Sequence, residues 1–164
     1  MFRKAFAACV AMCALTASTA FACPNFNLRP HFGGIELSAG FQPDPQVRNV
    51  TAGGTINLQR CRFNNLYTSG EPLAGFVTER PDFSLAWYGS SPQLTIALER
   101  TNADGILLVN APDGRTWYFD DDYRGLSPAV TIRNPMQGRY DIWIGSYDGS
   151  RRNPAQLIIT EYNY

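Results

Sequence analysis

Three consecutive aspartates, Asp120, Asp121 and Asp122, are the residues of this chain whose type and spacing best suit chemistry. Adjacent carboxylates repel one another unless a cation lies among them, and a hard cation such as Ca²⁺ takes about 6 to 8 oxygen ligands. Neighbouring side chains of an extended segment alternate in direction, so only one or two of the three can point the same way. We therefore predict a calcium site that Asp104 completes.

Two alternatives to this set of ligands stay open. Asp113 or Asp148 could replace Asp104 as the completing carboxylate, and the acidic turn could instead be solvated, with Arg124 as its partner. The spacing of the aspartates matches neither an EF-hand loop nor a nonapeptide calcium repeat. Calcium is the expected cofactor, and the sequence indicates no other.

Aromatic residues give a second candidate site, because exposed aromatic rings can stack on sugar rings. In the segment 139–147, Ile142 and Ile144 share one face with Tyr140, while Trp143 and Tyr147 share the other. If the isoleucine face is core, Trp143 and Tyr147 are partly exposed. The predicted ligand-binding residues are Trp143, Tyr147, Trp117 and Tyr123.

A catalytic site is not recognisable in the sequence. A serine peptidase needs a serine, a histidine base and a carboxylate, but the one histidine, His31, lies in a loop-like segment and no Gly-Asp-Ser-Gly-Gly element is present. We therefore predict a protein that is not an enzyme, with no catalytic residues. The alternative is a secreted hydrolase that uses acidic residues such as Asp121 and Glu79.

The elements that must position these residues are β-strands. Segments of alternating apolar residues follow one another at a spacing of about 10 residues, with no amphipathic helix between them and with turn residues such as Pro112-Asp113-Gly114. This pattern predicts an all-β fold, a single antiparallel β-sandwich of jelly-roll-like form. The expected strands are 33–37, 46–50, 54–59, 83–88, 93–99, 105–110, 116–119, 129–133, 139–147 and 155–161, and the segment 60–80 is expected to be a long connection with one short strand at most.

The first 22 residues have the features of a secretory signal. Arg3 and Lys4 precede an apolar run over residues 5–15, and Ala20-Phe21-Ala22 fits a small-x-small cleavage pattern. The run is shorter than the roughly 20 residues that a transmembrane helix needs. We therefore expect a signal peptide over 1–22, a single domain over 23–164, no transmembrane segment, and a periplasmic or secreted protein.

Removal of the signal also removes Cys9 and Cys13, which leaves Cys23 and Cys61. In an oxidising compartment these two have no other partner within the chain, so we predict a disulfide between them. A free or intermolecular Cys23, or a lipid on Cys23 at a new N-terminus, are the alternatives left open.

The remaining chain has 12 basic and 14 acidic residues, a net charge of −2, after Arg3 and Lys4 are subtracted from 14 basic residues. This balance weighs against a nucleic-acid partner.

The second half of the chain contains a recognisable set of residues: Asp104 to Leu108, Pro112-Asp113-Gly114, Asp120 to Asp122, Pro135, Gly138, Tyr140 and Ile142 to Gly145. On these residues the chain resembles bacterial pre-peptidase C-terminal domains. The resemblance covers residues 81–161, with a looser match at 41–45 and Gly53-Gly54. It extends to small stand-alone exported proteins of alphaproteobacteria that are often labelled peptidase S1. The resemblance implies a small β-sandwich associated with secreted peptidases. Phe119 stands where those relatives often have a cysteine, so no disulfide is carried over from them.

Together these observations predict an exported, non-catalytic binding or accessory module, stabilised by calcium. Its expected partner is a cell-envelope polymer, a glycan or an exported protein. The sequence indicates no oligomeric state.

Overall fold

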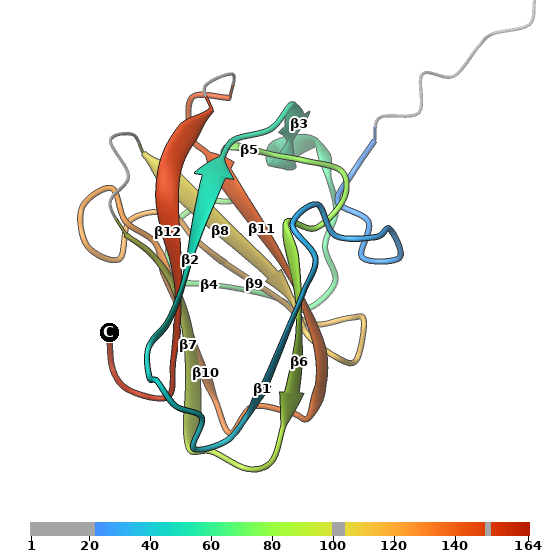
Figure 1. Ribbon diagram of the computed structural model, residues 1–164. Helices are drawn as coiled ribbons and strands as arrows, with labels where there is room; N and C mark the ends of the chain where they lie inside the picture. The colour runs from blue at the N-terminus through green and yellow to red at the C-terminus, as the bar shows by residue number, and fades with distance from the viewer. Residues whose placement is uncertain (1–21, 100–103, 150–151) are drawn as a thin grey trace, which may run out of the picture.

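The computed structural model describes residues 22–99, 104–149 and 152–164. It shows an all-β fold in which two sheets pack face to face as a β-sandwich, as the sequence predicted (Figure 1). The predicted signal peptide lies outside the described residues, apart from Ala22. In the described part of the chain, no helix is long and apolar enough to cross a membrane.

The larger sheet has eight strands. Its main path runs β1 (Gly34–Ser38), β6 (Phe83–Tyr88), β11 (Gly138–Ser146), β8 (Gly105–Asn110), β9 (Trp117–Asp120) and β4 (Leu66–Thr68), and β5 (Phe76–Val77) with β3 (Ile56–Asn57) attaches beside β11. The smaller sheet has four strands in the order β10 (Ala129–Arg133), β7 (Gln93–Glu99), β12 (Asn153–Thr160) and β2 (Gln46–Ala52).

The strand pairing is mostly antiparallel, but the pairs β1–β6 and β4–β9 are parallel. Four predicted strands, 83–88, 93–99, 105–110 and 129–133, have the predicted bounds. The predicted strand 54–59 is only partly extended, since β3 passes at once into a 3₁₀ turn, η1 (Leu58–Arg60). The segment 60–80 contains two short strands, β4 and β5, where at most one was expected.

The main core lies between the two sheets. Alternate residues of facing strands fill it, so Leu94, Ile96 and Leu98 of β7 meet the side that carries Tyr140, Ile142 and Ile144 of β11. All six of these side chains are fully buried. The period-two pattern of the sequence therefore identified the inward face of each of these strands correctly.

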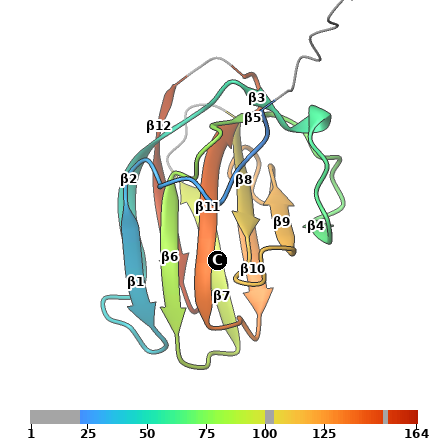
Figure 2. The same ribbon diagram turned by 90° about the vertical axis from the view of Figure 1, so that its right-hand side faces the viewer.

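A second apolar layer covers the outer face of the larger sheet. Trp143, Phe119 and Ile106 point away from the main core and pack with buried residues of the segment 53–80, including Leu58 and Val77. Partly buried residues pack against this layer from outside: Phe26, Ile56, Phe63, Leu66 and Leu73. We call the segments 22–32 and 53–80, which supply them, the covering layer. Figure 2 shows part of it, with η1 and β4 beyond β9.

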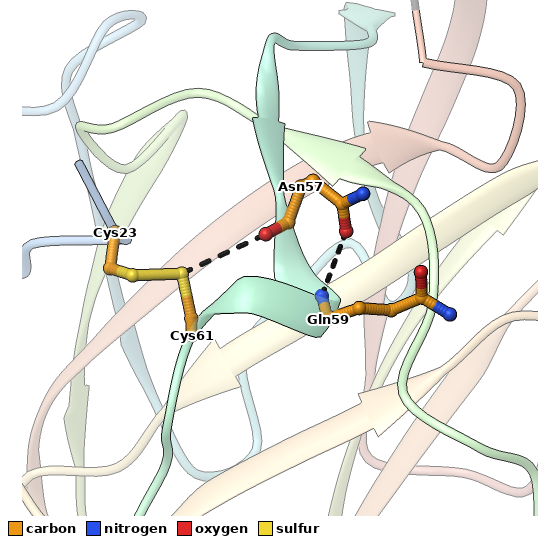
Figure 3. The surroundings of a disulfide bond; sticks show 4 residues. All are labelled: Cys23, Asn57, Gln59 and Cys61. Carbon is orange, nitrogen blue, oxygen red and sulfur yellow. Dashed lines mark hydrogen bonds between the residues drawn. A yellow bond between two sulfur atoms is a disulfide. The ribbon is translucent and has the colours of Figure 1, made fainter. Parts of the chain in front are cut away.

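A disulfide joins the two segments of the covering layer. Cys23 and Cys61 are bonded, with their Cα atoms 5.7 Å apart, as the sequence predicted (Figure 3). The side chain of Asn57 accepts a hydrogen bond from the Gln59 amide at 2.9 Å and so caps η1, which leads directly to Cys61. The bond therefore ties the start of the described chain to a capped, locally ordered turn.

Replacement of the disulfide should destabilise the fold chiefly through the unfolded chain. Cys23→Ala with Cys61→Ala removes a link across 38 residues, for which the chain-entropy model gives about 4 kcal/mol of unfolding free energy. Urea unfolding followed by tryptophan fluorescence measures this loss. An unchanged midpoint in the double variant would show that the covering layer is held by packing alone.

Candidate functional site

Asp120 is a structural carboxylate. It is 1% exposed, and its oxygens accept hydrogen bonds from the Ser69 hydroxyl, from the Tyr123 amide at 3.2 Å and from the Ala129 amide at 2.8 Å. These bonds link the end of β9 to the start of β10 in the other sheet and to the residues after β4. Because protein donors already satisfy both oxygens, Asp120 is the predicted metal ligand least available to an ion.

Asp121 lies in a different environment. It is 7% exposed, and its Oδ1 atom is buried with no hydrogen-bond partner in the described part of the chain. Burial is the main cause that raises its pKa to about 6, and the nearby carboxylates of Asp122, Asp120, Asp104 and Glu71 raise it further. A buried carboxyl oxygen without a donor is rare in a native fold.

Asp104 belongs to the same group of carboxylates. Burial, Asp122 and Asp148 all raise the pKa of Asp104, in that order of effect. Backbone contacts hold this region together, because the Tyr147 amide donates to the Asp104 carbonyl at 3.0 Å. We call Glu71, Asp104, Asp121, Asp122 and Asp148 the acidic cluster. Within the described residues, no three acidic, histidine or cysteine side chains are arranged closely enough to hold a metal ion as they lie.

The four predicted aromatic ligand residues do not form one exposed surface. Trp143 is fully buried and Trp117 is 6% exposed, whereas Tyr147 and Tyr123 are about half exposed. The expectation that Trp143 is partly exposed is therefore wrong. Its face of β11 does point away from the main core, but the covering layer buries it, and its indole N–H donates to the Glu79 carbonyl at 3.3 Å.

An aromatic pair that the sequence reasoning missed lies at the β4–β9 edge. The rings of Tyr67 and Tyr118 stack with centroids 5.5 Å apart, and Tyr67 is 60% exposed. The pair lines a cleft of about 260 Å³ with Ser69 and Thr131. Tyr67 lies in the segment that was expected to be mostly a connection, so no pairing partner could be predicted for it.

A larger cavity, of about 430 Å³, lies at one end of the sandwich. The cavity lies where β2 ends and β6 begins. Its lining includes Thr51, Asp82 and the Gly53-Gly54 pair, and the covering layer adds His31 and Phe32. In Figure 1 this is the end toward which the arrow of β2 points. We call this space the Asp82 cavity. Ligand cavities of proteins commonly have volumes of roughly 300 to 1,000 Å³.

Gly54 allows the chain to pass close to β5 beside this cavity. A Cβ atom at this position would lie 1.9 Å from the carbonyl carbon of Val77 and 2.5 Å from the backbone nitrogen of Thr78. Only glycine fits such an approach of two backbones. The Gly53 amide also donates to the Ile144 carbonyl at 3.1 Å, which fixes this wall of the cavity against β11.

Asp82 is the one carboxyl group among the described residues that line the cavity. It is 3% exposed, and its Oδ2 atom accepts a hydrogen bond from the Ile144 amide at 2.7 Å. Burial raises its pKa to about 7, and the Ile144 hydrogen bond opposes this shift in part. Asp82 is thus a mixture of carboxylate and neutral acid near neutral pH. Sequence reasoning missed it because Pro81-Asp82 belongs to no recognisable motif.

Backbone hydrogen bonds hold the covering layer against this carboxyl group. The amides of His31 and Phe32 donate to the carbonyls of Pro81 and Asp82, each at 2.8 Å. The Phe32 ring lies 5.4 Å from the Phe83 ring and 5.6 Å from the His31 ring, and Phe32 is 48% exposed. His31, which was not expected to take part in catalysis, therefore lies beside the Asp82 cavity.

Comparison of the chain with models of known families and with curated proteins finds no match to either.

The structural role of Asp120 predicts a large loss of stability on its removal. Asp120→Ala leaves three donors without their acceptor, of which the Ala129 amide is buried. A buried unsatisfied donor costs about 1 to 3 kcal/mol, so we expect a loss of about 2 kcal/mol in unfolding free energy. With EDTA present, Asp122→Ala, at an exposed neighbour, is the matched control and should change this free energy little. Equal losses in urea unfolding would contradict this assignment.

The raised pKa of Asp82 predicts a pH dependence of stability with a definite sign. The folded pKa of about 7 exceeds the ordinary value of 3.8, so the folded state binds this proton more tightly than the unfolded state. The associated stability is complete at low pH, below the ordinary value, and is lost as pH rises through about 7. Between about pH 5 and about pH 8 the wild type should lose about 2 to 3 kcal/mol relative to Asp82→Asn. Parallel pH profiles of the two proteins would contradict the shift.

Proposed function

We propose that this protein is an exported, non-catalytic binding module whose acidic cluster holds a calcium ion. Its partner is a cell-envelope polymer, a glycan or an exported protein. The proposal rests most directly on Asp121, whose buried Oδ1 atom has no donor in the described part of the chain, while the carboxylates of Glu71, Asp104, Asp120 and Asp122 raise its pKa. A bound cation relieves both the missing contact and the repulsion.

The ion would engage Asp121 and Asp122 of the turn together with Asp104, and not Asp120, whose oxygens are used within the fold. Because the acidic side chains are not gathered tightly as they lie in the described residues, backbone carbonyls and water would complete the oxygen ligands that Ca²⁺ requires. The function of the ion in this proposal is structural: it joins the β9–β10 turn to the residue that precedes β8.

Signal-like residues 1–22 and the disulfide support the exported location, since disulfides persist in oxidising compartments. The resemblance to pre-peptidase C-terminal domains supports an accessory role beside a secreted enzyme. A hydrolase is the second candidate, and one observation favours it: Asp82, a carboxyl group with a pKa near 7, lines a cavity and has the properties of a general acid.

Thermal unfolding with excess EDTA and then with millimolar calcium tests the metal site. Calcium that binds only the folded protein should raise the melting temperature by several degrees, and magnesium should raise it less. Asp121→Ala with Asp122→Ala should remove the rise, because it takes away the ligands. The control is Glu36→Ala with Glu79→Ala, which removes two exposed carboxylates outside the cluster and should keep the rise.

No calcium-dependent shift in the wild type would exclude the proposed ion. A shift that persists in Asp121→Ala with Asp122→Ala would place the ion elsewhere in the molecule.

A further inference from the structure

We propose that the Asp82 cavity binds a neutral, hydroxyl-rich ligand, a saccharide unit, with the Asp82 carboxyl group at its floor and the Phe32 ring at its rim. This inference rests on the proposed binding function, and it assigns that function a site and a ligand class. It does not depend on the calcium ion, which belongs to the acidic cluster.

The floor of the cavity offers strong hydrogen bonding to hydroxyl groups. One Asp82 oxygen is held by the Ile144 amide, and within the described residues no second protein donor reaches the carboxylate. Its other oxygen is therefore available to a ligand that lies in the cavity. A carboxylate with low exposure accepts charge-assisted hydrogen bonds from hydroxyl groups, which are shorter and stronger than those between neutral groups.

Threonine hydroxyl groups extend this polar lining. Thr51, Thr55 and Thr78 line the same cavity, from β2 and from the covering layer. The Thr78 hydroxyl donates to the Arg80 carbonyl at 2.7 Å, which leaves its oxygen lone pairs as acceptors. A ligand with several adjacent hydroxyl groups can both donate to and accept from such a lining.

The rim supplies an apolar surface for the C–H face of a sugar ring. Phe32 lines the cavity and is 48% exposed, and its ring lies against the rings of Phe83 and His31. Backbone bonds from His31 and Phe32 to Pro81 and Asp82 fix the rim relative to the floor. The two recognition elements are thus positioned before a ligand arrives, which limits the entropy lost on binding.

The charges of the cavity favour a neutral ligand. Among the described lining residues, Asp82 is the one carboxylate and Arg152 the one guanidinium, with His31 as the other titratable group. Neither positive nor negative charge predominates in this lining, whereas a phosphate site would be mainly positive and a polyamine site mainly negative. A neutral saccharide meets both the acceptor and the donors without an unpaired charge.

The number of acidic side chains in the cavity distinguishes saccharide binding from saccharide hydrolysis. Glycoside hydrolysis ordinarily uses two carboxyl groups that flank the scissile bond, about 5 to 10 Å apart. The described lining of the Asp82 cavity contains a single acidic side chain. We therefore infer capture of the saccharide without its cleavage.

Calorimetric titration and saturation-transfer NMR of the purified protein test this inference. The probes are glucose, galactose, mannose and N-acetylglucosamine, each as the monosaccharide and as a linked tetrasaccharide. At least one should bind, and its affinity should fall at least tenfold in Asp82→Asn and in Phe32→Ala. The Asp82→Asn variant keeps a side-chain oxygen as acceptor for the Ile144 amide, so a folding defect is not expected, and circular dichroism and thermal unfolding verify this for both variants.

Tyr67→Ala is the matched control, because Tyr67 is an exposed aromatic residue of the other cleft. It should leave the affinity unchanged. Loss of binding in Tyr67→Ala with retention in Phe32→Ala would overturn the inference and place the saccharide on the Tyr67–Tyr118 pair. Binding by none of the probes, or binding of spermidine in preference to every saccharide, would also overturn it.

Two further measurements distinguish the saccharide site from a hydrolase and from the calcium site. Mass spectrometry of the bound tetrasaccharide should find it intact, and release of shorter products that Asp82→Asn abolishes would show a hydrolase instead. Repeating the titration in EDTA separates the two proposals. Saccharide binding that persists without calcium supports the saccharide site in the cavity, independently of the ion. A calcium-dependent rise in melting temperature without any saccharide binding would support the calcium site and overturn the saccharide site.

Discussion

The need to bury the outer face of the larger sheet organises this molecule. A β-sandwich ordinarily needs one apolar face per sheet, but β8, β9 and β11 carry large apolar residues on both faces, among them Trp117, Trp143 and Ile106. At roughly 25 cal/mol per Å² of buried apolar surface, leaving two indoles in water would cost several kcal/mol. The covering layer meets this need, and the disulfide fastens its two parts together.

The proposed binding cavity follows from that covering layer. The segment that begins near Cys23 continues over the sheet and brings His31 and Phe32 beside Asp82, while the segment after β2 passes through Gly54 and supplies Thr55 and Thr78. Part of the lining of the Asp82 cavity therefore comes from the covering layer, while Thr51 comes from β2. A site of this kind depends on packing and on backbone hydrogen bonds more than on any local motif.

The buried carboxyl groups of Asp120, Asp82 and Asp121 differ in how many protein donors they have. Asp120 has a donor for each oxygen and links the two sheets, so its burial is offset by the bonds it accepts. Asp82 and Asp121 are also buried, but each keeps a raised pKa, because burial is not fully compensated. Buried ionisable groups with perturbed pKa values are concentrated at functional sites. Asp82 and Asp121 lie in the two places to which we assign ligands.

Much of the sandwich could be predicted from the sequence, because period-two alternation reports the inward face of strands such as 83–88 and 93–99 directly. The disulfide could be predicted because removal of the expected signal peptide would leave only two cysteines. The same alternation places Trp143 on the second face but carries no information on what covers that face, so its exposure was predicted wrongly. The Asp82 cavity could not be predicted, since its residues lie far apart in the sequence, from His31 to Arg152, and meet only through long-range pairing.

A crystal structure of the protein grown with a bound neutral saccharide tests the central claim most directly. We predict a sugar ring in the cavity between Phe32 and Asp82, with at least one ring hydroxyl within hydrogen-bond distance of the Asp82 carboxylate. A saccharide bound at the Tyr67–Tyr118 cleft, or a cavity closed by the covering layer while the sugar lies elsewhere, would contradict it.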